Sequence, residues 1–196
     1  MLTLVLLLIF LIIVGLLWFQ GLWNNAITLI NTTLAAIVAL NYFETVSKLI
    51  DKQQPSYTYM WDFLALWGLF ALTFGLLRLA TDMLSRRRVV FEFWTEMVGR
   101  SVLAIWVAWI FIGFTCVTMH TAPLNAHPMG FQKSYNSGNF LGMSPGKQWL
   151  GFMQSRSTGA LSGGSGGEFD ANSEFVLKYY QRRVDFESEE EYRVSR

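Results

Sequence analysis

Charged side chains are scarce in this 196-residue chain, and none occurs before Glu44. They make up 15% of the sequence, whereas soluble domains carry roughly 25%. With a net charge of +1 and no clustered basic face, the chain has no electrostatic footprint for nucleic acid. The single cysteine, Cys116, cannot form an intramolecular disulfide bond. These absences exclude a nucleic-acid partner and favour a membrane protein.

Motifs of phosphate binding, of zinc peptidases and of serine hydrolases are also missing. The sequence contains no P-loop, no H-E-x-x-H and no G-x-S-x-G elbow. Sulfur and imidazole side chains gather near the end of the last apolar run, but their spacing matches no ligand pattern. This group comprises Cys116, Met119, His120, His127 and Met129. We interpret it as an ordinary membrane-exit segment and expect no catalytic residue, no cofactor and no metal.

The chain has instead a series of long apolar runs. The first, residues 2–19, would form a helix about 27 Å long, close to the thickness of a bilayer core. It lacks a basic start and a small-residue cleavage site, and a second apolar run follows after a short polar elbow. We therefore interpret the two runs as a membrane hairpin rather than a signal peptide. The pattern predicts an all-α integral membrane protein with transmembrane spans at residues 2–19, 24–43, 61–84 and 100–119.

The segment between the third and fourth runs mixes aromatic, aliphatic and acidic residues. It reads SRRRVVFEFWTEMVGR, residues 85–100, and its apolar side chains share one face at 100° per residue. We predict an amphipathic connector helix at the membrane surface, with a strand-like loop as the alternative. Glu96 lies one helical turn from Arg100, and Arg78 one turn from Asp82, so each pair is expected to form an ion pair.

The distribution of basic residues predicts the orientation in the membrane. Four arginines lie within residues 85–100, whereas the other side carries Lys48, Lys52 and, further out, Lys133. The positive-inside rule then places residues 85–100 in the cytoplasm and both termini outside. The chain divides into a transmembrane domain, residues 1–119, and an extracytoplasmic tail, residues 120–196.

The tail is polar and mostly irregular in pattern, with short helices expected at residues 145–155 and 172–183. Ser144 followed by Pro145 is the start signature of the first, and the Gly/Ser composition of residues 157–167 is typical of a flexible linker. Such a tail cannot bury a core of its own, so we predict that its aromatic clusters dock on a partner protein. The predicted docking residues are Trp149, Phe152, Met153, Phe175, Tyr179 and Tyr180.

Small residues recur within the apolar runs, and they let membrane helices approach closely. We assign this helix-packing role to Gly21, Ala35, Ala39, Ala71, Gly75, Ala104 and Ala108. The amides of the second run have two interpretations. Asn24, Asn25 and Asn31 are expected to make contacts between helices, and a polar conduction path that includes Thr28 is the alternative.

The first two runs and their elbow resemble the colicin V production protein family of bacterial inner-membrane proteins. The likeness covers about residues 1–119 and rests on QGLWNNAITLINTTLAAIVA, residues 20–39, and on Gly99 near the end of the connector. The chain departs from the family pattern at Gln20, Asn25, Thr33, Val102, Leu103 and Trp106. The resemblance implies an envelope protein tied to export of a secreted peptide, and it supplies no catalytic residues to carry over.

The sequence therefore predicts a non-enzymatic structural or accessory subunit of a larger envelope complex in the bacterial inner membrane. Its expected partners are membrane lipids and either a larger complex or further copies of itself. The alternative is a homo-oligomeric pore or small-solute exporter.

Overall fold

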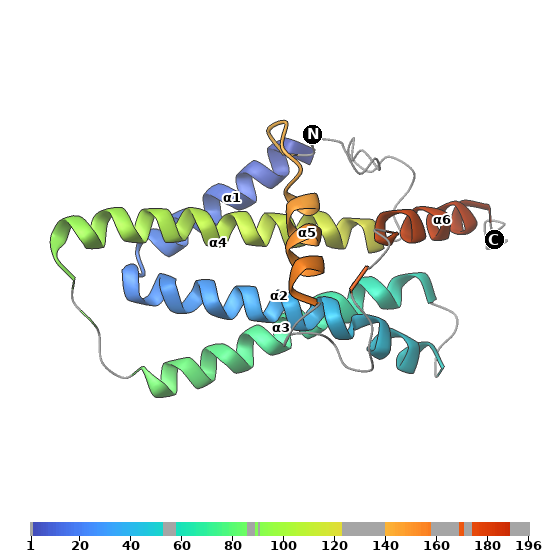
Figure 1. Ribbon diagram of the computed structural model, residues 1–196, viewed down its shortest axis with the longest axis horizontal. Coiled ribbons are helices and arrows are strands. Elements are labelled where there is room, and N and C mark those ends of the chain that lie inside the picture. Colours follow the sequence, from blue (N-terminus) through green and yellow to red (C-terminus); the bar gives the residue numbers. More distant parts are fainter. Residues whose placement is uncertain are drawn as a thin grey trace, which may run out of the picture.

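The protein is all-α, as its sequence predicts (Figure 1). The computed structural model describes residues 2–52, 58–85, 89, 91–122, 140–157, 169–170 and 174–188. Within these residues six helices form: α1 (Leu2–Trp18), α2 (Leu22–Asp51), α3 (Thr58–Leu84), α4 (Phe93–Thr121), α5 (Pro145–Ser157) and α6 (Phe175–Ser188).

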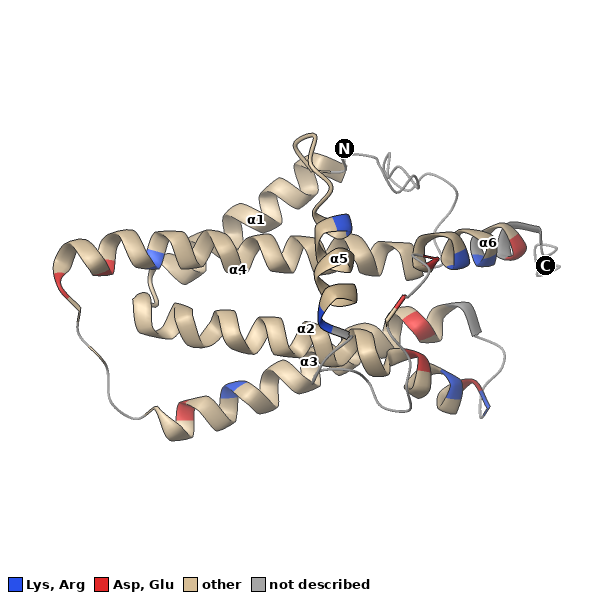
Figure 2. Cartoon of the chain, viewed as in Figure 1, with Lys and Arg blue, Asp and Glu red and all other residues tan. Residues whose placement is uncertain are grey.

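The length and hydropathy of the helices make this chain a multi-pass membrane protein. Helices α2, α3 and α4 are each long and apolar enough to cross a membrane, and α1 is a shorter apolar helix of 17 residues. Figure 2 shows long uncharged stretches in these helices, with charged residues gathered toward their ends. A bilayer accepts this arrangement because it leaves the charges near water.

Helix α4 is the element on which most of the others pack. It contacts α1, α2, α3, α5 and α6. The start of α1 lies against the last turns of α4, where Leu6 packs with Cys116, and the end of α1 lies near Ala104. Helices α1 and α4 are thus antiparallel, whereas α2 begins beside the start of α4 and runs parallel to it.

The elbow between α1 and α2 depends on Gly21. Its φ of 82° lies in the left-handed region that glycine adopts without strain. A Cβ at this position would also lie 3.0 Å from Oε1 of Glu96 on α4. That carboxylate accepts a hydrogen bond from the first amide of α2, Leu22 N–H, at 2.7 Å. The acid therefore caps α2 from a neighbouring helix, where a negative charge also complements the helix dipole.

The prediction of a separate connector helix is wrong. Residues 89, 91 and 92 are not helical, and Glu92 is the extended N-cap of α4. From Phe93 the chain is one uninterrupted helix to Thr121, because it contains no proline and Gly99 costs too little to break it. The amphipathic residues form the first turns of α4 itself, and Phe93 and Trp94 are both exposed.

Helix α5 lies across α4, and two glycines allow the close approach (Figure 1). A Cβ at Gly113 of α4 would lie 3.2 Å from the carbonyl oxygen of Pro145, and one at Gly146 would lie 3.2 Å from Cβ of Cys116. The backbones thus meet without intervening side chains, the usual way that helices pack closely in membranes.

The tail helices share a core with the membrane helices. Trp149, Leu150 and Met153 of α5 and Phe175 and Tyr179 of α6 are buried in the same cluster as residues of α2, α3 and α4. These five side chains are therefore covered by the chain's own membrane helices. The described part of the tail thus shares the core of the membrane helices. The Gly/Ser linker, apart from Ser157, lies outside the described residues.

Candidate functional site: a charged junction between α6 and the α2–α3 pair

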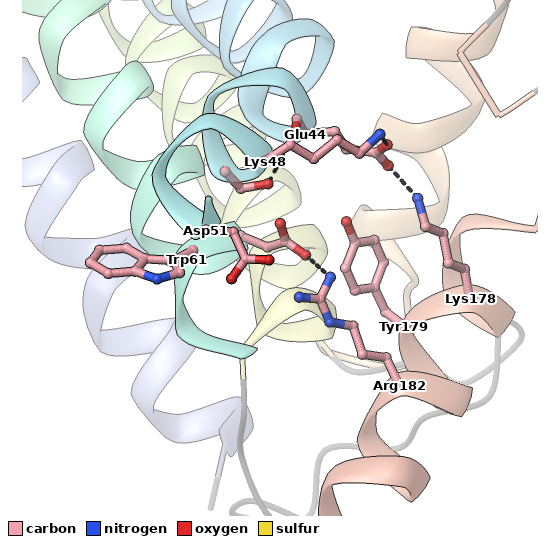
Figure 3. A pocket seen from close by; sticks show the side chains of 9 residues that line it. Glu44, Lys48, Asp51, Trp61, Lys178, Tyr179 and Arg182 are labelled. Atoms are coloured by element: carbon pink, nitrogen blue, oxygen red, sulfur yellow. Dashed lines mark hydrogen bonds and ion pairs between the residues drawn. The ribbon is translucent and has the colours of Figure 1, made fainter. Parts of the chain in front are cut away.

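Charged side chains from three helices meet where α6 lies against the ends of α2 and α3 (Figure 3). Lys178 and Arg182 are one turn apart on α6, so both point to the same side of that helix. The Lys178 ammonium lies 2.6 Å from Oε1 of Glu44 on α2, and Arg182 pairs with Asp62 on α3. Two ion pairs thus join the tail to two different membrane helices. We call this arrangement the charged junction.

The two ion pairs differ in burial, and the difference decides their importance. Asp62 is only 4% exposed, whereas the side chains of Lys178 and Glu44 are 52% and 36% exposed. An exposed pair contributes at most about 1 kcal/mol. Loss of one partner of a buried pair is far more costly, because it leaves an uncompensated charge inside the protein. The Asp62–Arg182 pair is therefore the more costly of the two to break.

An aromatic cluster lies beside the charged junction and also joins α6 to α2. The rings of Phe175 and Tyr179 on α6 lie 6.4 Å and 6.3 Å from the ring of Phe43 on α2, between centroids. Phe169, before α6, adds a fourth ring 5.8 Å from Phe175. Offset and edge-on aromatic pairs at these distances add to the stabilisation from burial alone. Apolar contact and ion pairing thus hold α6 at the same place.

A cavity of about 320 Å³ opens between these residues. Glu44, Asp62, Lys178 and Arg182 line it together with Tyr179, which is 2% exposed. Burial raises the pKa of the Tyr179 phenol, and the nearby Asp62 and Glu44 carboxylates raise it further. The phenol is therefore neutral.

Asp170 organises the start of α6. Its Oδ1 accepts a hydrogen bond from Phe175 N–H at 2.8 Å, and its carbonyl oxygen accepts one from Gln154 of α5 at 3.1 Å. Burial raises the pKa of the Asp170 carboxyl, and this outweighs the amide hydrogen bonds that favour its ionised form. Asp170 thus ties the two tail helices to each other at an electrostatic cost.

The amides that the sequence singles out in α2 lie between helices. Asn25 is fully buried and donates to the carbonyl oxygen of Arg100 on α4 at 3.1 Å. Asn31 donates to Thr81 on α3 at 3.1 Å, and Arg78 of α3 donates to Thr28 at 3.2 Å. Asn24, half-buried at the elbow, donates to Gln20. Asn25 and Asn31 thus make contacts between helices, as one of the two interpretations of the sequence expects.

The seven predicted packing residues fall into three groups. Ala35, Ala39, Ala104 and Ala108 are fully buried. Gly21 is half-buried beneath Glu96. Ala71 is exposed and Gly75 is half-buried, and a Cβ at Gly75 would meet no described heavy atom within 4 Å. The last pair lies on a face of α3 that no described helix covers.

The predicted docking residues are mostly occupied within the chain. Trp149, Met153, Phe175 and Tyr179 are buried, and Phe152 is half-buried with its ring stacked on Trp149 at 5.2 Å. Tyr180 is 43% exposed. Docking of these residues on a partner stays a prediction, but the α6 side chains Phe175 and Tyr179 already bind the chain's own Phe43.

Sequence reasoning missed the residues of the charged junction. Two features of the sequence could have indicated these residues. Asp62 is the single acid near the start of an apolar helix, and Lys178 and Arg182 are one helical turn apart. It also paired Glu96 with Arg100, whereas Glu96 accepts from Leu22 N–H. The predicted Arg78–Asp82 ion pair is confirmed, at 3.2 Å.

The described residues contain no group of three or more His, Cys, Asp or Glu side chains placed to hold a metal ion. Cys116 and His120 are buried in α4, while His127 and Met129 lie outside the described residues. No protein-family model, curated protein or solved structure matches this chain.

Proposed function

We propose that this chain is a non-enzymatic membrane protein that crosses the membrane four times and acts as a structural or accessory subunit of a larger envelope complex. The colicin V production family, which the first 119 residues resemble, suggests the bacterial inner membrane as its location and export as its context. The proposal places residues 85–100 in the cytoplasm and both termini outside.

The packing of α1 supports a fourth crossing. Helix α1 runs antiparallel to α4 from Cys116 to the level of Ala104. Its 17 residues span about 26 Å, which approaches the hydrocarbon thickness of a bilayer. Because α1 packs along α4 over this length, α1 lies at the same depth in the membrane as α4. Helix α4 is itself long enough to cross the membrane.

The observation that carries the subunit role is the uncovered face of α3. Only 17% of its most apolar stretch is buried, compared with 50% for α2 and 56% for α4. Gly68, Ala71 and Gly75 lie on this face at helical spacing, and there is open space beside Gly68 and Gly75. Small residues four apart allow a further transmembrane helix to pack closely. We infer that a helix of a partner chain occupies this face.

The size of the native particle tests the proposal. Membranes are solubilised in mild detergent and the complex is sized by gel filtration with light scattering. We expect a particle larger than one 22.4 kDa chain with its detergent. Replacing Ala71 and Gly75 by leucine should release the partner, whereas Gly15→Leu, on an open part of α1, should not. A monomer in the unaltered protein would overturn the proposal.

A flux assay separates the proposal from the pore alternative. Purified protein in liposomes should conduct no small solute, because the amides Asn25 and Asn31 are buried between helices. Solute leak that disappears on Asn25→Leu would favour the pore instead.

A further inference from the structure

An apolar groove runs along the outer surface between α1 and α3. Helix α1 packs on α4 and α3 packs on α2. The two outer helices therefore leave a surface groove of about 570 Å³ between them. Its walls include Ile9 and Ile13 of α1 and Phe70 and Phe74 of α3, and Val107 of α4 lies at its base. We call it the acyl groove.

The acyl groove has the length of most of one membrane leaflet. From Ile9 to Leu17 along α1, and from Phe70 to Arg78 along α3, it extends eight residues, which is about 12 Å at 1.5 Å per residue. Half of a bilayer core is about 15 Å thick. Because Leu17 and Arg78 lie toward the ends of their helices, the groove opens at the membrane surface on the side of the α1–α2 elbow.

A second, polar cavity begins where the acyl groove ends. It has a volume of about 670 Å³, and Gln20 and Arg78 line both spaces. Asp82, Glu96 and Arg100 also line it. We call it the headgroup cavity. One end of this composite site accepts hydrocarbon and the other accepts charge, as an amphipathic ligand requires.

Arg78 reaches the junction of the two spaces with hydrogen-bonding capacity to spare. Its Nε donates to Asp82 and one Nη donates to Thr28, both at 3.2 Å. A guanidinium carries five N–H groups. The other three have no acceptor within the described part of the chain. Such a planar fork matches the oxygen atoms of a phosphate group.

Arg100 brings a second guanidinium to the headgroup cavity without an ion-pair partner among the described residues. Its guanidinium lies over the ring of Trp18, 4.8 Å from the centroid, and its buried Nε has no acceptor in that part of the chain. Glu96, the nearest acid in sequence on α4, is engaged by Leu22 N–H. A half-buried positive charge of this kind is stabilised when an anion binds beside it.

We propose that this composite site binds a glycerophospholipid, with one acyl chain in the acyl groove and the phosphate in the headgroup cavity that Arg78 and Arg100 both line. A membrane lipid is the occupant because the groove faces the bilayer along its length, and because the unsatisfied donors lie at the membrane surface, where lipid phosphates are. The site requires only that the chain is a membrane protein, so it does not depend on the partner complex proposed above.

Native mass spectrometry of the purified full chain in mild detergent tests the site. Dioleoylphosphatidylglycerol is the probe, and dioleoylglycerol has the same chains without the phosphate. We expect one phosphatidylglycerol to stay bound, and dioleoylglycerol to bind at least tenfold more weakly, because hydrogen bonds to a charged group are strong. Inorganic phosphate alone should not displace the lipid, because it cannot fill the groove.

Matched variants separate the two halves of the site. Arg78→Gln with Arg100→Gln should weaken phosphatidylglycerol binding at least tenfold, whereas Arg156→Gln, exposed on α5, should leave it unchanged. Ile13→Trp should block the groove, whereas Leu11→Trp, which is exposed on α1 outside the lining, should not.

Three outcomes would overturn the proposal. The first is equal binding of the two lipids, and the second is unchanged lipid binding in both the arginine and the Ile13 variants. The third is a loss of lipid binding in Arg156→Gln as large as that in the double arginine variant. If the arginine variant does not fold, the comparison of Ile13→Trp with its control Leu11→Trp tests the site. The measured quantity is again the number of phosphatidylglycerol molecules bound per chain.

Discussion

The charged junction makes a quantitative prediction about Arg182. Replacing this residue by methionine keeps most of the aliphatic volume of the side chain but removes the positive charge that faces Asp62. Asp62 is 4% exposed and would then be a buried carboxylate without its cation. We expect α6 to detach from the ends of α2 and α3 far more often in this variant.

The expected size follows from the burial of the pair. Breaking a buried ion pair costs about 3–5 kcal/mol, and the low end applies here because the Arg182 side chain is 30% exposed. A loss of about 3 kcal/mol raises the population of the open state roughly 100-fold. Replacing Lys178 by methionine breaks the exposed pair with Glu44 and should cost at most about 1 kcal/mol, or about fivefold.

Cysteine labelling measures the opening of α6. Val176, which is 6% exposed, is replaced by cysteine in a chain whose native Cys116 is replaced by alanine. The rate of reaction with a maleimide then reports how often this position is uncovered. We expect a rate increase of roughly 100-fold for Arg182→Met and of about fivefold or less for Lys178→Met, by the same arithmetic.

The double variant with Asp62→Leu and Arg182→Met provides the control. Removing both charges leaves no uncompensated carboxylate, so it should restore most of the protection. If Arg182→Met and Lys178→Met accelerate labelling equally, burial does not set the strength of the two pairs and the reasoning fails.

Two further predictions concern the tail. Because burial raises the pKa of Asp170 above its ordinary 3.8, the folded state binds the proton more tightly than the unfolded state. Stability should therefore fall as the pH rises from 3.8 through the higher folded pKa and level off above it. Asp170→Asn, which keeps an acceptor for Phe175 N–H, should remove that fall in thermal unfolding curves recorded across the acidic range. Gly113→Leu should push α5 off α4 and lower the stability by about 1–3 kcal/mol, because a Cβ there already lies 3.2 Å from a backbone oxygen of Pro145. Gly151→Leu, on an open face of the same α5, is its control, and an equal loss in both variants would contradict the close-approach argument.

The sequence by itself determines the membrane character and the long helices of this protein. Apolar length is a local property, so α2, α3 and α4 follow from composition and from the absence of breakers. The same holds for the turn at Gly21 and the start of α5 at Pro145. The ion pair between Arg78 and Asp82 is equally local, since its partners lie one turn apart on one helix.

Only the tertiary structure decides where the tail goes. Arg182 and Asp62 are 120 residues apart, and Phe43 meets Tyr179 across a similar separation. No spacing along the chain identifies such partners, because they are selected by which helix ends come together in three dimensions. A tail too small to bury its own core still buries its aromatic side chains when membrane helices extend far enough to receive them. Helix α2 does so by continuing past its apolar run to Asp51, and this extension supplies Glu44 to the charged junction.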